Sequence, residues 1–70
     1  MLQPKSVNQR ALRDGKKYML HITNRQHGST LSPEFVASRM IAESRARDLE
    51  RVGLTAKVFL ILNNGDLHAA

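Results

Sequence analysis

The stretch ILNNGDLH, residues 61–68, constrains the fold most because Asn64-Gly65 lies between two apolar runs. An Asn-Gly pair in this setting predicts a β-hairpin with a two-residue loop. In that register Leu62 faces Leu67 and Ile61 faces His68. The side chains expected to share one face of the sheet are Val58, Leu60, Leu62, Leu67 and Ala69. Such an apolar face needs a helix to cover it.

The segment from Ser32 to Val52 predicts that helix, the longest element of the chain. Ser32 suits the N-cap, Pro33 suits the first helical position, and Gly53 can end the helix. The centre of the expected apolar stripe consists of Phe35, Ala42, Ala46 and Leu49, with Ile41 and Val52 at its flank.

Two further elements are expected before this helix. Residues 6–9 match a capping box, and Asp14-Gly15 can stop the short helix that it opens. Residues 17–23 alternate as a strand, and the long helix favours a parallel pairing of this strand with residues 57–62 if the two are neighbours, pairing with residues 66–70 being the alternative. We expect residues 1–70 to form one small two-layer α+β domain with a loose tail at residues 1–5. One long helix would pack on a three-stranded mixed sheet, in the order short α-β-α-β-β.

Composition excludes several classes of protein. The 70 residues contain no cysteine, so neither disulfides nor thiolate metal sites are available. The longest apolar run, residues 58–62, is too short for a membrane span, and no apolar signal segment follows the start of the chain. A cytoplasmic protein is expected.

The net charge of +5 is unevenly distributed. Residues 1–25 hold six basic residues against one acidic residue, whereas residues 26–70 hold five of each. This asymmetry suggests an acidic partner approached from the N-terminal third, although a solvated basic arm explains it equally well.

The second face of the predicted sheet is half apolar and has no long helix left to cover it. Besides Lys57, it would carry a possible partner-binding patch: Met19, His21, Phe59, Ile61 and His68. Three explanations compete. The short N-terminal helix covers the face, the face mediates self-association in a homodimer or assembly, or it binds another protein.

No motif indicates catalysis. His21 and His68 would share the second face, but no carboxylate accompanies them and no metal-binding spacing occurs. The loop at residues 27–30 has one glycine, which falls short of a phosphate-binding loop. We expect a non-enzyme without a catalytic residue, cofactor or metal.

Nucleic-acid binding is the alternative that charge supports. Arg45, Arg47 and Arg51 on the long helix would add phosphate contacts to the basic N-terminal third. Acidic residues are interleaved with them, so a solvated, ion-paired surface is the competing interpretation. Three aromatic residues offer no stacking pair on a strand.

The leading hypothesis is a small basic binding protein that docks onto a larger host protein or nucleoprotein complex and modulates it, with inhibition as the expected direction. In size and layout the chain resembles small inhibitors and host-takeover proteins encoded by phages, a likeness that rests on no motif. The basic residues expected to contact a partner or nucleic acid are Lys5, Arg10, Arg13, Lys16 and Lys17, with Arg45, Arg47 and Arg51. Direct, weakly sequence-specific DNA or RNA binding and self-association are the alternatives.

Overall fold

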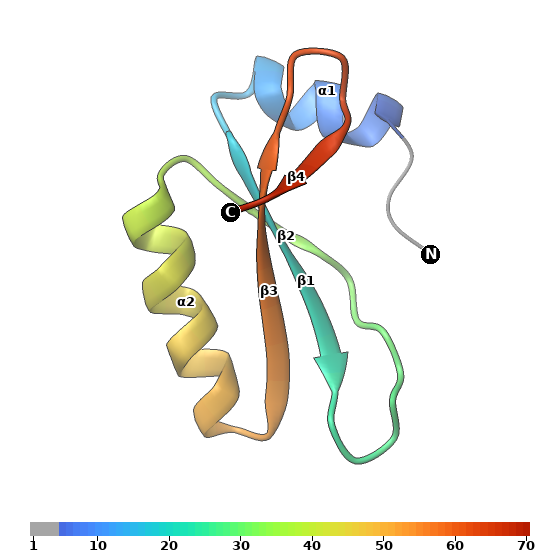
Figure 1. Ribbon diagram of the computed structural model, residues 1–70, viewed down its shortest axis with the longest axis vertical. Helices are drawn as coiled ribbons and strands as arrows, with labels where there is room; N and C mark the ends of the chain where they lie inside the picture. Colours follow the sequence, from blue (N-terminus) through green and yellow to red (C-terminus); the bar gives the residue numbers. More distant parts are fainter. Residues whose placement is uncertain (1–4) are drawn as a thin grey trace.

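A computed structural model describes residues 5–70, which form two helices and a four-stranded antiparallel sheet (Figure 1). The elements are α1 (Lys5–Arg13), β1 (Tyr18–Asn24), β2 (Glu34–Val36), α2 (Arg39–Arg51), β3 (Leu54–Ile61) and β4 (Leu67–Ala69). The strands lie in the order β2-β1-β3-β4. The predicted α+β class is confirmed, but the sheet has four strands instead of three. No helix among the described residues is long and apolar enough to cross a membrane.

Each face of the sheet carries its own hydrophobic core. The first, which we call the α2 core, has four buried residues, Leu20, Ile22, Ala42 and Leu49. The second, which we call the α1 core, has three buried residues, Ala11, Met19 and Ile61. Alternate residues of β1 therefore face opposite cores. In Figure 1, α2 runs alongside β3, whereas α1 lies at the end of the sheet that carries the β3–β4 turn.

The short helix α1 is present and ends as predicted, but Ser6 of the predicted capping box lies within the helix instead of opening it. Its last turn ends in a Schellman arrangement, in which the Lys16 N–H donates to the Ala11 carbonyl and the Gly15 N–H donates to the Leu12 carbonyl. Gly15 has φ +81°, which glycine adopts without steric penalty. The predicted tail at 1–5 lies outside the described residues, except for Lys5, which opens α1.

The predicted start of the long helix is wrong. Residues 34–36 form the edge strand β2, and α2 begins after Ser38, whose side chain accepts a hydrogen bond from the Ile41 N–H at 3.2 Å. Strand geometry lets Phe35 pack in the α1 core while Val36 packs in the α2 core. A helix at these positions could not serve opposite faces of the sheet with successive residues.

The buried face of α2 matches the predicted stripe at its centre but not at its flank. Ala42, Ala46 and Leu49 pack in the α2 core as predicted. Ile41 and Val52, predicted at the flank of the stripe, are 52% and 72% exposed. Val52 is the C-cap residue, beyond the last turn of α2.

The predicted parallel pairing of the first and second long strands is also wrong. β1 and β3 are antiparallel, with Leu20 opposite Val58. The extra strand β2 reverses the chain before α2 begins, because it is antiparallel to β1. The helix therefore connects β2 to β3, two strands that run in the same direction with β1 between them.

The hairpin is present, but its register is shifted by one residue from the prediction. Ile61 pairs with Leu67, and Leu60 pairs with His68. The Leu62 N–H donates to the Asp66 carbonyl at 2.8 Å, which makes a three-residue loop in which Gly65 has φ +89°. A shift of one residue exchanges the two faces of β4. Leu67 therefore packs in the α1 core instead of under α2.

Candidate functional site

The predicted apolar patch on the second face is not an open surface. Met19 and Ile61 are buried, at 0% and 4% exposure, and Phe59 packs partly buried beside them. The short helix α1 covers them through Ala11 and Leu12. Of the three explanations for this face, cover by the N-terminal helix is the arrangement observed at these positions.

The two histidines predicted to share that face are separated. His21 lies opposite Lys57 on the face of the α1 core, and it is half-buried. His68 lies opposite Leu60, on the other face, because of the shifted register. No group of three or more metal-ligating side chains occurs within residues 5–70.

Ion pairs engage several of the predicted basic contact residues. Lys5 pairs with Asp66 at 2.9 Å, joining α1 to the β3–β4 turn. The hydrogen bonds from Lys5 and Asn64 lower the pKa of the Asp66 carboxyl. Two further predicted contacts are also paired, Arg45 with Glu34 and Arg51 with Asp48.

The ion pairs leave a strongly basic remainder. Four pairs occur within residues 5–70, and the fourth joins Arg39 to Glu43. All eleven basic and six acidic side chains lie in this range. Seven basic side chains therefore have no ion pair there, against two acidic ones, Asp14 and Glu50. The unpaired basic residues are Arg10, Arg13, Lys16, Lys17, Arg25, Arg47 and Lys57.

Four of these seven residues lie together around the C-terminal end of α1. We call Arg10, Arg13, Lys16 and Lys17 the basic cluster. Arg10 and Arg13 belong to the last turn of α1, and the lysines follow in the connection to β1. All four are exposed. Positive charge at a helix C-terminus is favourable, which accounts for Arg10 and Arg13 but not for the added lysines.

Two hollows flank α1 on opposite sides. The α1 groove lies between α1 and β2, has a volume of about 280 Å³, and is lined by Val7, Arg10, Ala11, Asp14, Lys16 and Phe35. The hairpin-side hollow has a volume of about 430 Å³ and is lined by Gln9, Leu12, Arg13 and Asn63. The basic cluster therefore borders both hollows.

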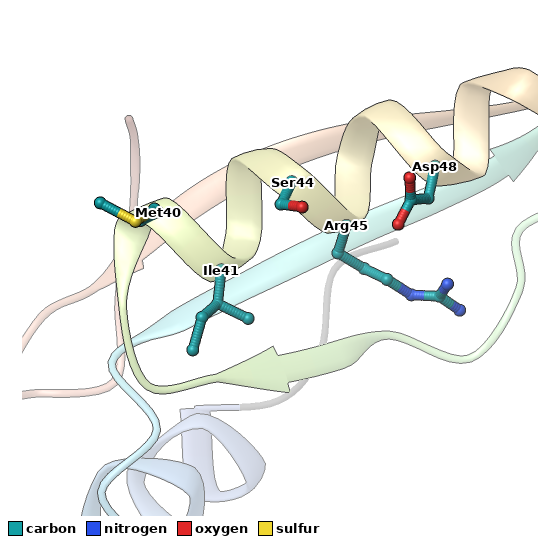
Figure 2. Close-up of a pocket in the computed structure, with 5 residues that line it drawn as sticks. All are labelled: Met40, Ile41, Ser44, Arg45 and Asp48. Carbon is teal, nitrogen blue, oxygen red and sulfur yellow. The ribbon is translucent and has the colours of Figure 1, made fainter.

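A third hollow, the α2 groove, lies along the outer side of α2 (Figure 2). It has a volume of about 410 Å³ and is lined by Met40, Ile41, Ser44, Arg45 and Asp48. Met40 is 79% exposed.

Among the residues that line this groove, Arg45 is joined to the edge strand β2 by hydrogen bonds. Its Nε and Nη2 donate to the two carboxylate oxygens of Glu34, at 2.8 and 3.0 Å. These hydrogen bonds hold the pKa of Glu34 below its ordinary value of 4.5. Arg45, predicted as a partner or nucleic-acid contact, thus holds α2 to β2.

Sequence reasoning found the basic cluster and missed both grooves. The cluster is contiguous in sequence, so a charge count detects it. The α1 groove needs Phe35 in a strand, and Phe35 was assigned to a helix. For the other wall of the groove, the sequence offered one signal, the apolar residues Val7 and Ala11 spaced four apart on α1.

Comparison of the chain with protein-family models, curated proteins and solved structures finds no match. Its function must therefore be argued from its own residues.

Proposed function

We propose that the chain is a small non-enzymatic binding protein that docks through its basic cluster onto an acidic surface of a larger macromolecular assembly, such as a nucleic-acid-handling complex, and inhibits it. The observation that carries this proposal is the unpaired charge around the end of α1. Four exposed basic side chains lie within eight residues there, and only Asp14 opposes them within that stretch.

A cluster of exposed charges of one sign affects mainly the rate at which the two partners meet. A surface of one sign attracts a partner of the opposite sign and raises the association rate, while apolar contacts supply most of the affinity. The sheet face predicted to supply those apolar contacts is largely covered by α1. The α1 groove, which adjoins the basic cluster, is the apolar surface that remains next to the charge.

Direct DNA or RNA binding is the second candidate, since the same exposed basic residues suit phosphate contacts. All three aromatic side chains pack in the cores: Tyr18 in the α2 core, Phe35 and Phe59 in the α1 core. None of the three rings is fully exposed, so base stacking would contribute little to a nucleic-acid complex. Such a complex would depend on phosphate contacts and would have little sequence preference.

Affinity capture from a cell lysate, with and without nuclease treatment, tests the proposal. Arg10→Glu/Arg13→Glu cancels the net charge of the four-residue cluster, and Lys57→Glu changes an exposed, unpaired lysine on β3 as a control. We expect one or more proteins to be retained by the wild type and by Lys57→Glu, to survive nuclease treatment, and to be lost with the double variant.

Two results would contradict this expectation. Loss of all captured protein after nuclease treatment would favour direct nucleic-acid binding. A salt series with labelled duplex and single-stranded oligonucleotides would then give the number of phosphates contacted, from the slope of log affinity against log salt. Capture that the double variant leaves unchanged would remove the basic cluster from the interface.

A further inference from the structure

The α1 groove combines an apolar interior with a basic rim. Val7 and Ala11 of α1 form one wall, and Phe35 of β2 forms the other. Arg10 and Lys16 stand at the rim, and neither has an ion pair within residues 5–70. Val7 remains 37% exposed, so this wall is accessible to an occupant.

The open shape of the groove restricts its occupant. It has a volume of about 280 Å³ and is open to solvent, whereas sites for small molecules bury most of the ligand surface. A large apolar side chain of an extended partner segment can enter such an open groove. The rest of such a segment would lie across the rim, within reach of Arg10 and Lys16.

The charge around the groove fixes the chemistry of the segment. The lining has two basic residues, Arg10 and Lys16, and one acidic residue, Asp14, and Lys17 follows Lys16 directly in sequence. A neutral or basic segment would meet net positive potential, whereas an acidic segment would be attracted to it. The basic rim and the apolar interior of the groove therefore both suit an acidic segment that carries a large apolar side chain.

The other two hollows have weaker claims. The hairpin-side hollow is lined mainly by polar side chains and has one cation, Arg13. In the α2 groove, Arg45 and Asp48 already pair with Glu34 and Arg51. Neither combines apolar walls with unpaired charge.

We propose that the α1 groove receives a large apolar side chain from an acidic segment of the partner protein, with Arg10 and Lys16 pairing with carboxylates on either side of it. This inference rests on the proposed docking function and specifies the chemistry of the partner. Burial of one such side chain contributes about 1.5–3 kcal/mol, which corresponds to an affinity gain of about tenfold or more.

Two short labelled peptides of equal charge provide the test. One carries a single leucine flanked by glutamates, and the other carries serine at that position. Fluorescence anisotropy at low salt measures their binding to the wild type, to Val7→Ser, to Arg10→Glu/Lys16→Glu and to the control Lys57→Glu. Thermal unfolding of each variant verifies that it folds.

We expect the leucine peptide to bind the wild type about tenfold more tightly than the serine peptide. Val7→Ser should remove most of that difference, Arg10→Glu/Lys16→Glu should weaken the binding of both peptides, and Lys57→Glu should change neither by much. If a variant fails to fold, methyl chemical-shift changes in the wild type serve instead. The leucine peptide should shift Val7 and Ala11 and leave Met40 and Ile41 unshifted.

Equal binding of the two peptides, or methyl shifts confined to Met40 and Ile41, would overturn the inference. The proposed docking function would survive that result if lysate capture still depended on Arg10 and Arg13. A labelled oligonucleotide that binds more tightly than either peptide, together with nuclease-sensitive capture, would overturn both in favour of nucleic-acid binding.

Discussion

At the scale of single residues, Gly65 is where α1 and the β3–β4 turn meet most closely. A Cβ at this position would lie 2.7 Å from the Lys5 carbonyl oxygen and 3.1 Å from Gln9 Cγ. Asn8, which is 1% exposed, donates through Nδ2 to the Gly65 carbonyl at 2.8 Å. The glycine therefore allows both a left-handed turn and the approach of a helix backbone.

We expect Gly65→Ala to lower the free energy of unfolding by about 1–3 kcal/mol, measured by urea denaturation. Strain at φ +89° and displacement of α1 both contribute. Gly53→Ala is the matched control, because Gly53 has the same φ of +89° with nothing within 4 Å of the added Cβ. Equal losses in the two variants would mean that the contact with α1 contributes nothing.

Glu34 gives a prediction about pH. Its pKa is lowered in the folded state by hydrogen bonds from Arg45, so the folded state favours the ionised carboxylate. This contribution is fully present above the ordinary value of 4.5 and is lost as pH falls through the lower folded pKa. We expect Glu34→Gln to reduce Tm slightly at pH 7 and to have less effect at pH 3. A difference in Tm that stayed constant over this range would exclude the carboxylate charge as its cause.

At the scale of elements, two serines are candidates for the N-cap of α2, Ser32 from the sequence pattern and Ser38 in the structure. Ser38 caps the helix, with its side chain accepting from the Ile41 N–H, whereas Ser32 lies before the strand β2. We expect Ser38→Ala to cost about 1 kcal/mol of stability, and Ser32→Ala to change it by less than about 0.5 kcal/mol. Urea denaturation of both variants measures this. The reverse order would mean that α2 starts where the sequence pattern predicted.

The mistake at this helix shows which elements sequence can predict. α1 and β1 were predicted within a residue or two because a terminating glycine and simple alternation are local signals. Ser32-Pro33-Glu34 is an equally good local start signal, yet tertiary packing overrides it. Phe35 and Val36 stabilise the protein more as a strand, since each then packs in a different core. A local signal also misled at the hairpin. Asn64-Gly65 favours a two-residue turn, whereas the structure has a three-residue loop and a register shifted by one residue.

The candidate site was predictable to the extent that it is local. The basic cluster spans residues 10–17, so composition alone identifies it. The apolar part of the site was expected at Met19 and Ile61, which α1 covers. Whether a marginal helix docks on a sheet depends on contacts between distant residues, such as Asn8 and Gly65. That information is not contained in either segment by itself.

At the scale of the whole molecule, one sheet joins two small cores. Tyr18 packs in the α2 core, while the adjacent Met19 packs in the α1 core. A domain of this size has a total stability of about 4–10 kcal/mol, on typical values per residue. Removal of one large buried side chain from either core is therefore a large fraction of that total.

We expect Ile61→Ala, which truncates a side chain 4% exposed, to lower stability by about 2–5 kcal/mol. The loss should be global, because β3 contributes to both cores. Far-ultraviolet circular dichroism, which follows both helices, and Tyr18 fluorescence, which follows the α2 core, should therefore give the same urea midpoint. Leu49→Ala, in the α2 core, should likewise lower the urea midpoints of both signals by the same amount. If circular dichroism changed at a lower urea concentration than Tyr18 fluorescence, and did so only in Ile61→Ala, α1 would detach while the α2 core stayed folded. In either case, loss of partner binding in an Ile61 variant would report unfolding, so the interface must be tested at exposed positions such as Val7 and Arg10.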